Sequence, residues 1–141
     1  PETHPQADSP QADLEALVAK VRAGASSAIT QYFFNTDAFL WFRDAAARAG
    51  VNVPIAPGIM PITNFRQLAR FSDACGAEIP RWIRLRLAQF GDDLVSLRAF
   101  GHEVMAAQCQ SLVDEGVANL HFYTMNQAEP TLDLIAALKT A

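Results

Sequence analysis

The sequence predicts an α/β fold in which helices cover a parallel sheet. Three short runs of apolar, β-forming residues are separated by longer stretches whose apolar residues recur at helical spacing. Strands that alternate with amphipathic helices form parallel sheets, because each helix carries the chain back to the start of the next strand. The length of 141 residues allows one domain of ordinary size or part of a larger one.

The first half of the chain predicts a helix, a strand and a second helix. Ser9 can cap a helix, and Pro10 suits the first helical position because the N–H it lacks would be unpaired there. The stretch "SAITQYFF", residues 27–34, is short and apolar, so it predicts a buried strand. Residues 35–50 follow with capping side chains, an apolar stripe and a final glycine, which predict the second helix.

The second half of the chain predicts two further strands. Proline is poorly tolerated inside a central strand, so in "VNVPIAPGIMPI" we expect the strand near residues 51–57 and a shaped loop after it. Thr63 or Asn64 caps the next helix. The later elements are expected in this order: a helical region over 81–115 that is broken near 91–93, a strand over 117–124 and a helix over 128–140.

Three parallel strands alone would leave two apolar edges unpaired, which invites aggregation. A (β/α)8 TIM barrel has about 250 residues, and this chain of 141 residues supplies a little over half of that. We therefore interpret residues 1–141 as the C-terminal portion of a single (β/α)8 barrel domain. The N-terminal strands would lie on another chain or in a portion that this sequence lacks.

Composition and motifs exclude several kinds of function. The net charge of −4 and the lack of a basic stripe argue against nucleic acid. No run of 18 apolar residues and no secretory leader is visible, so we expect no membrane span. Cys75 and Cys109 stand far apart and predict free thiols in a reducing, cytoplasmic compartment. No grouped metal ligands and no motif for covalent catalysis are present.

Gln31 is a lone amide within a run of buried-type residues, in the second half of its strand. In a (β/α)8 barrel the chemistry takes place at the C-terminal ends of the strands, so an inward Gln31 would face the mouth. An amide both donates and accepts hydrogen bonds, which suits pteridines, flavins or nicotinamide. The alternative is a glutamine that bonds to a polar side chain on a neighbouring strand.

Two further groups of polar residues fall near strand ends. Gln67 and Phe71 lie four residues apart, off the apolar stripe of their helix. An amide beside a ring could bind a flat ligand there, by a hydrogen bond and by stacking. The alternative is a solvent-facing Gln67 and a Phe71 that packs under the extra helices. His121 and Tyr123 share one side of the last strand, and a satisfied core role is the expected one for His121. Gln127 follows in the loop after that strand.

Several stretches together resemble the methylenetetrahydrofolate reductase family: "PETHPQA", "ADLEALVAKVRAGASSAITQYFF", "PGIMPITNFRQLARF" and "HFYTMN". They fall in the right order across nearly the whole chain. The resemblance implies strands six to eight of an FAD-containing (β/α)8 barrel. It also implies reduction of 5,10-methylenetetrahydrofolate to 5-methyltetrahydrofolate by NAD(P)H, in a ping-pong hydride transfer through the flavin that serves one-carbon metabolism and methionine biosynthesis.

The resemblance assigns roles to particular residues. Cofactor binding is implied for His4, Ala7, Asp13 and Lys20, and substrate binding for Gln31, Gln67, Phe71 and Gln127. Many family members carry an arginine at the position of Gln127, where it pairs with the folate's glutamate carboxylate, and a neutral amide would hold that carboxylate more weakly. Ala16 and Ala19 lack the polar groups that some relatives direct towards FAD.

The family's proton-donating glutamate belongs to the first strand, so no catalytic residue is expected in this chain. Its expected partners are methylenetetrahydrofolate, NAD(P)H and the remaining N-terminal half of the barrel. An inactive or split half-barrel that acts as an interaction partner is one alternative, and another TIM-barrel enzyme is a second. The choice between NADH and NADPH stays open, as does the oligomeric state, a homo-oligomer included.

Overall fold

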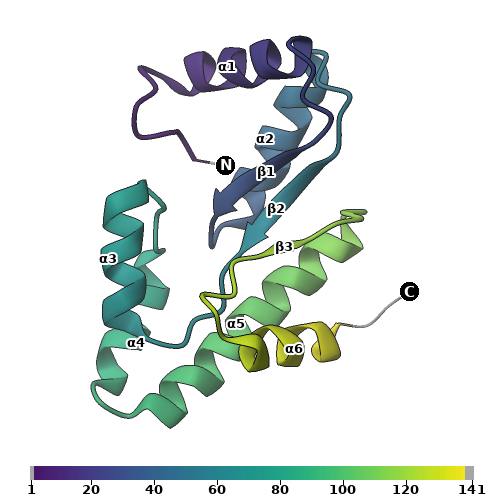
Figure 1. Ribbon diagram of the computed structural model, residues 1–141. Coiled ribbons are helices and arrows are strands. Elements are labelled where there is room, and N and C mark those ends of the chain that lie inside the picture. Colours follow the sequence, from purple (N-terminus) through teal and green to yellow (C-terminus); the bar gives the residue numbers. More distant parts are fainter. Residues whose placement is uncertain (1, 139–141) are drawn as a thin grey trace.

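The computed structural model describes residues 2–138 and has an α/β architecture. Strands β1 (Ala28–Tyr32), β2 (Ile55–Ile59) and β3 (His121–Phe122) form a parallel sheet in that order (Figure 1). The helices are α1 (Pro10–Arg22), α2 (Thr36–Arg48), α3 (Phe65–Cys75), α4 (Arg81–Phe90), α5 (Leu94–Asp114) and α6 (Ala128–Ala137). The predicted alternation of helices with parallel strands is therefore confirmed. The last residues of the helix expected over 128–140 lie outside the described part.

The starts of α1 and α3 follow local capping, as the sequence predicts. The side chain of Ser9 accepts a hydrogen bond from the N–H of Ala12 at the start of α1. Asn64, rather than Thr63, caps α3 by accepting from the N–H of Gln67. The expected break in the long helical region separates α4 from α5. Each of these features depends on side chains within a few residues, which is why the sequence alone indicates them.

Strand β2 lies later in the chain than expected, and it includes Pro57. The expected bounds near 51–57 were wrong at both ends: β2 begins after Pro54 and continues past Pro57, where Thr30 of β1 compensates for the proline. The pairing of β1 with β2 is irregular between Ile29 and Tyr32, beside Pro57. The next N–H, that of Gly58, then donates to Oγ1 of Thr30 at 2.9 Å. A side-chain hydroxyl thus continues the pairing where the ladder is irregular.

Strand β3 is much shorter than the expected 117–124. Its pairing with β2 joins Gly58 to His121 and Ile59 to Phe122. The residues before His121 therefore lie opposite the part of β2 that contains Pro57, which has no N–H to donate. One further hydrogen bond follows, from the N–H of Tyr123 to the carbonyl of Ile59 at 2.8 Å.

The hydrophobic core lies between the sheet and the helices α2 and α5. In Figure 1, α2 lies behind β1 and β2, and α5 runs below β3; α2 and α5 also contact each other. Phe33, directly after β1, stacks on Phe39 of α2 with ring centroids 5.3 Å apart. Gln108 of α5 is buried and donates from Nε2 to the carbonyl of Phe33 at 3.0 Å. These contacts fix α2 and α5 against the C-terminal end of β1.

No helix within residues 2–138 is both long enough and apolar enough to cross a membrane.

Candidate functional site

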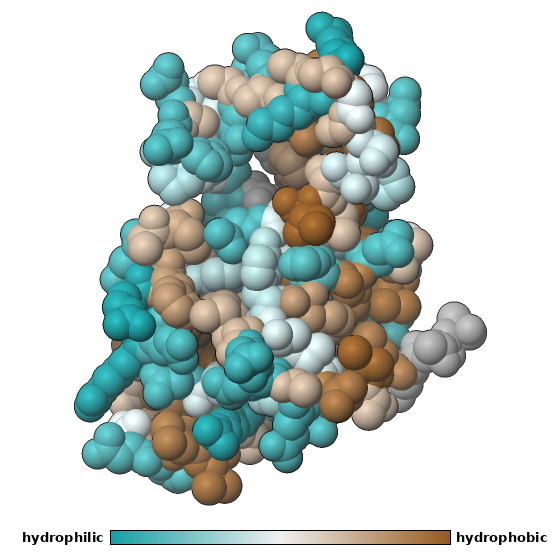
Figure 2. Space-filling model, viewed as in Figure 1, coloured by the Kyte–Doolittle hydropathy of each residue, from teal (hydrophilic) through white to brown (hydrophobic). Residues whose placement is uncertain are grey.

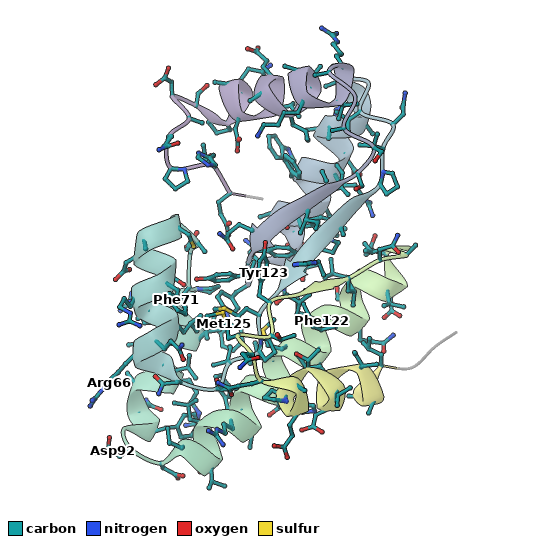
Figure 3. The ribbon with its side chains drawn as sticks, viewed as in Figure 1. Arg66, Phe71, Asp92, Phe122, Tyr123 and Met125 are labelled. Atoms are coloured by element: carbon teal, nitrogen blue, oxygen red, sulfur yellow. The ribbon has the colours of Figure 1, made fainter. Side chains whose placement is uncertain are left out.

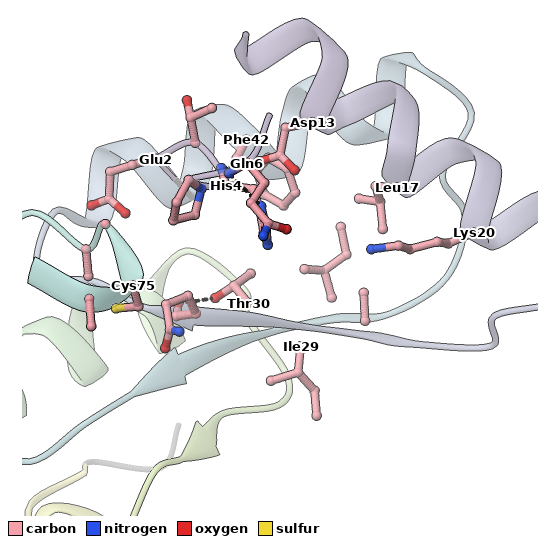
Figure 4. Close-up of a pocket in the computed structure, with 18 residues that line it drawn as sticks. Glu2, His4, Gln6, Asp13, Leu17, Lys20, Ile29, Thr30, Phe42 and Cys75 are labelled. Atoms are coloured by element: carbon pink, nitrogen blue, oxygen red, sulfur yellow. Dashed lines mark hydrogen bonds between the residues drawn. The ribbon is translucent and has the colours of Figure 1, made fainter. Parts of the chain in front are cut away.

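The first candidate site is a cavity of about 470 Å³ between the N-terminal segment, α1 and β1, which we call the α1–β1 cavity. His4, Asp13 and Lys20, three of the residues expected to bind cofactor, line this cavity. Gln31 lines it from β1. Figure 4 shows Asp13 and Lys20 extending from α1, with His4 on the N-terminal segment. In Figure 2 the same face is hollowed between α1 and the rest of the molecule.

Hydrogen bonds hold the N-terminal segment against α1. Oδ2 of Asp13 accepts from the backbone N–H of His4 at 2.9 Å. Nδ1 of His4 accepts from the N–H of Gln6 at 3.1 Å, and the N–H of Ala7 donates to the carbonyl of His4 at 2.9 Å. Ala7 is not among the residues that line the cavity. It closes the turn that positions His4.

Lys20 lies seven residues after Asp13 on α1, which is two helical turns, so both side chains are on the same side of the helix about 10 Å apart along its axis. Lys20 is exposed and has no ion-pair partner within residues 2–138. A cation and a carboxylate at this separation can contact two different parts of one elongated polar ligand.

Gln31 is exposed, although most of the residues around it are of the buried type, and its predicted role in ligand binding stays a prediction. The reason for its exposure is its position on β1, an outer strand of the described sheet that is paired on one side only. Oε1 of Gln31 accepts from the N–H of Tyr32, the next residue, at 3.0 Å. Bonding to a polar side chain of a neighbouring strand, the alternative interpretation, does not occur within the described residues. The side-chain NH2 group of Gln31 therefore makes no hydrogen bond within the described residues and can donate to another partner.

The second candidate site is a crevice of about 20 Å³ between the end of β2, α3 and the loop after β3, which we call the α3 crevice. Gln67, Phe71 and Gln127, the other residues expected to bind substrate, all line it. The volume is close to that of a single water position, so the crevice can hold the edge of a ligand rather than a whole one. Figure 3 shows Phe71 and Tyr123 directed towards each other across this region.

The structure places Gln67 and Phe71 between the two positions that the sequence left open, and their role in ligand binding stays a prediction. Each side chain is half-buried, so Gln67 is not simply solvent-facing. Phe71 packs against the edge of the hydrophobic core, as the alternative predicted, yet it also lines the crevice. The guanidinium of Arg70 lies 5.5 Å from the centroid of the Phe71 ring.

Tyr123 connects the two cavities, and the sequence reasoning did not identify it as a site residue. The hydroxyl of Tyr123, which lines the α3 crevice, donates to the carbonyl of Thr30, which lines the α1–β1 cavity, at 3.0 Å. The hydroxyl of Tyr32 lies 3.0 Å from Oγ of Ser72 on α3. Burial raises the pKa of both tyrosines above the ordinary value, so both phenols stay protonated at neutral pH. The hydrogen bond from Tyr123 to Thr30 therefore joins the linings of the two cavities.

His121 is half-buried, and the satisfied core role expected for it stays a prediction. Its ring meets that of Tyr123 edge to face, with centroids 4.8 Å apart, which places both on one side of β3 as predicted. Among residues 2–138, no group of three or more histidine, cysteine, aspartate or glutamate side chains could hold a metal ion.

Comparisons with known proteins agree with one another. A family model described as methylenetetrahydrofolate reductase matches residues 1–139. The chain is 43% identical over 129 residues to the 5,10-methylenetetrahydrofolate reductases of Salmonella typhimurium and of Escherichia coli, and each match covers 92% of this chain and 44% of the relative. It is 33% identical over 147 residues to methylenetetrahydrofolate reductase (NADH) 1 of Arabidopsis thaliana, covering 98% of this chain and 25% of the plant protein. The chain thus spans less than half the length of these relatives.

A solved structure supports the fold. It is that of an uncharacterized protein from Clostridium thermocellum described as binding two copies of 5-methyl-5,6,7,8-tetrahydrofolic acid. The TM-score is 0.60 at 20% identity, and the match covers 91% of this chain and 47% of the other. At this identity the likeness shows a shared fold and nothing about ligands.

Proposed function

This chain belongs to the methylenetetrahydrofolate reductase family, and from that premise we propose that it forms strands six to eight, with their helices, of a (β/α)8 barrel that reduces 5,10-methylenetetrahydrofolate to 5-methyltetrahydrofolate. Because the chain covers 44% of its bacterial relatives, the proposal concerns the complete protein. NAD(P)H is the reductant, and FAD, when bound, supplies the hydride-transfer chemistry. This chain contributes walls of the cofactor and folate sites, while the proton donor lies in the other half of the barrel.

One observation supports this proposal: most residues of the two predicted sets line two cavities that a hydrogen bond from Tyr123 to Thr30 connects, while Gln31 lines the α1–β1 cavity and Ala7 lines neither. His4, Asp13 and Lys20 surround the α1–β1 cavity. Gln67 and Gln127 belong to the α3 crevice. Gln67 and Gln127 lie far apart in the sequence, so their grouping comes from the tertiary structure, whereas Asp13 and Lys20 share one side of α1. A cofactor and a substrate that exchange a hydride must lie side by side, which this arrangement permits.

The donor set of the α1–β1 cavity fits FAD. The Lys20 ammonium can pair with a phosphate group. Oδ2 of Asp13 is occupied by the N–H of His4, which leaves Oδ1 to accept from a ribose hydroxyl. A volume of about 470 Å³ falls within the range of cofactor pockets, about 300–1,000 Å³. The residues present are therefore suited to the ribose and phosphate region of the cofactor.

On the folate side, Gln31 and Phe71 have complementary roles. The amide of Gln31 keeps its donors available and is exposed on β1, so it can hydrogen-bond to the pteridine ring or to the nicotinamide. Phe71 presents a half-buried ring on which folate or NAD(P)H can stack. Gln67 would contact the tail of the folate, next to the neutral Gln127.

A visible absorption spectrum of the complete protein tests the proposal. We expect a flavin band that bleaches on anaerobic addition of NAD(P)H and returns on addition of methylenetetrahydrofolate. Lys20→Ala should weaken FAD binding about tenfold, since a charge-assisted hydrogen bond contributes roughly 1.5 kcal/mol. Arg22→Ala is the matched control, because Arg22 is another exposed cation on α1 and does not line the cavity. A colourless protein that cannot be loaded with FAD would refute the proposal.

A second candidate function is a half-barrel that pairs with another chain without activity of its own. It is favoured by the free outer edge of β1, where Ile29 is 55% exposed. Mixing this chain with a separately expressed N-terminal half distinguishes the two functions. Recovered flavin binding supports the reductase, whereas a stable complex without flavin supports the interaction protein.

A further inference from the structure

Helix α4 keeps large apolar side chains exposed on one of its sides. Ile83 and Leu87 form its buried side. On the opposite side, Trp82 is 59% exposed and Leu85 is 53% exposed. At helical spacing these two residues lie beside three further exposed ones, and we call the whole set the α4 face: Arg81, Trp82, Leu85, Ala88 and Gln89. An exposed apolar surface of this kind indicates a place where another molecule binds.

The charges at both ends of α4 oppose its helix dipole. Arg81 is the first residue of α4 and Arg84 lies one turn on, at the end where the partial charge of a helix is positive. Asp92 follows the other end, where the partial charge is negative. Neither arginine has an ion-pair partner within residues 2–138, and the pair of Asp92 with Arg66, at 4.0 Å, is so exposed that it contributes little. In a single copy these charges are therefore poorly compensated.

We propose that the α4 face is a contact between two copies of this protein, in which the two α4 helices pack antiparallel about a twofold axis. Arg81 of each copy then lies at the C-terminal end of the other α4, where the dipole favours a cation, and beside Asp92 of the second copy. Leu85 lies at the middle of α4, so the two Leu85 side chains meet at the axis. Trp82 covers Gln89 of the second copy. The charges that oppose the dipole in one copy are thus compensated by the other.

A second copy is the partner that the charges favour. Helix α4 carries three arginines and no acidic residue, whereas the chain as a whole has a net charge of −4. An anionic membrane would attract the arginines but repel Asp92, which lies at the end of the same surface. The rest of the barrel would join at the outer strands β1 and β3, whereas α4 packs beside the start of α5, away from both strands (Figure 1). The contact therefore does not depend on the proposed activity.

The α4 face is ordered before two copies meet. The ring of Trp82 meets that of Phe100 on α5 edge to face, with centroids 6.2 Å apart, and Nη1 of Arg86 donates to Oε1 of Gln89 at 3.1 Å. Little side-chain freedom is therefore lost on association. A helix of ten residues is only about 15 Å long, so the contact is smaller than a standard interface. We expect a reversible dimer with a dissociation constant in the micromolar range.

Sedimentation velocity of the complete protein over a range of micromolar concentrations tests the contact. Arg81→Asp should weaken association about tenfold or more, because it places like charges opposite each other at two symmetric positions. Asp92→Arg should have the same effect for the same reason. The double variant Arg81→Asp, Asp92→Arg should associate as the wild type does, since the exchanged charges meet across the axis. A protein that does not associate, or an Arg81→Asp variant that associates like the wild type, would show that the proposed contact is wrong.

Leu85→Cys gives a direct readout of the geometry, because mild oxidation should join the two copies by a disulfide at the axis. Trp41→Cys is the matched control, since Trp41 is an exposed apolar residue on α2 and lies outside the α4 face. Equal rates of cross-linking in the two variants would contradict the antiparallel arrangement. Binding of a monomeric protein to phosphatidylserine vesicles, lost in Arg81→Asp, would assign the α4 face to anionic lipid and overturn the proposal. The flavin spectrum tests the proposed function separately from all of these outcomes.

Discussion

Substituting Gly58 by alanine should strongly destabilise the sheet, because this glycine lies where β1, β2 and the residue after β3 approach most closely. A Cβ atom at this position would lie 2.5 Å from the carbonyl oxygen of Thr30 and 2.9 Å from the backbone carbon of Gln31. It would also lie 2.8 Å from Cε2 of Tyr123. Two of these atoms belong to the backbone, which cannot rotate away as a flexible side chain can. Relief therefore requires β1 and β2 to separate.

The magnitude follows from two contributions. Overpacking in a well-packed interior costs about 1–3 kcal/mol. Separating the strands also weakens the hydrogen bond from the N–H of Gly58 to Oγ1 of Thr30, which contributes about 1 kcal/mol net. We expect the free energy of unfolding to fall by about 2–4 kcal/mol. The melting temperature should fall by about 2–4 °C for each kcal/mol.

Urea denaturation of the flavin-free protein, followed by far-ultraviolet circular dichroism, measures this loss without a contribution from cofactor binding. The double variant Gly58→Ala, Tyr123→Ala is the control, because it removes the ring but leaves both backbone atoms in place. A loss below about 0.5 kcal/mol for Gly58→Ala would refute the steric argument. A coupling energy equal to the whole loss would show that the Tyr123 ring, and not the backbone, sets the cost.

Three further predictions concern single side chains. Tyr32→Phe should cost about 1–2 kcal/mol in urea denaturation, because it leaves the hydroxyl of Ser72, which is 2% exposed, without its partner; adding Ser72→Ala should recover part of the loss. Burial raises the pKa of Cys109 from 9.0 to about 11, so the folded protein keeps this proton to higher pH than the unfolded chain. The free energy of unfolding should therefore fall as pH rises from about 9 to about 11, and a Cys109→Ala variant that shows the same slope would contradict this origin. Gln31→Ala should lower kcat/KM for folate more than it lowers stability, since the one hydrogen bond of its side chain within the described residues is accepted from the neighbouring Tyr32 N–H; unchanged kinetics with a large loss of stability would show a structural role.

Much of the fold could be predicted from the sequence because its signals are local. Helix starts at Ser9 and Asn64 depend on a side chain and an N–H within three residues. The alternation of strands and helices follows from hydrophobic periodicity, which each segment carries by itself. Strand boundaries were less accurate. The position of β2 depends on Thr30, which lies far from Pro57 in the sequence and supports the pairing beside it.

For the candidate site too, some features could be predicted from the sequence and others could not. The residue types and the family resemblance single out Asp13, Lys20, Gln31 and Gln67, and their roles stay proposals. The sequence did not indicate that a tyrosine at 123 would join two cavities through the carbonyl of Thr30.

The sequence by itself determined the order of the elements, their caps and the chemical character of the candidate ligands, because these depend on residues close together along the chain. Only the tertiary structure decided which polar side chains share a cavity, that Gln31 is exposed on an outer strand, and that Trp82 and Leu85 stay exposed on α4. The physical reason is that such groupings arise from packing between segments distant in the chain, whose relative positions no local pattern encodes.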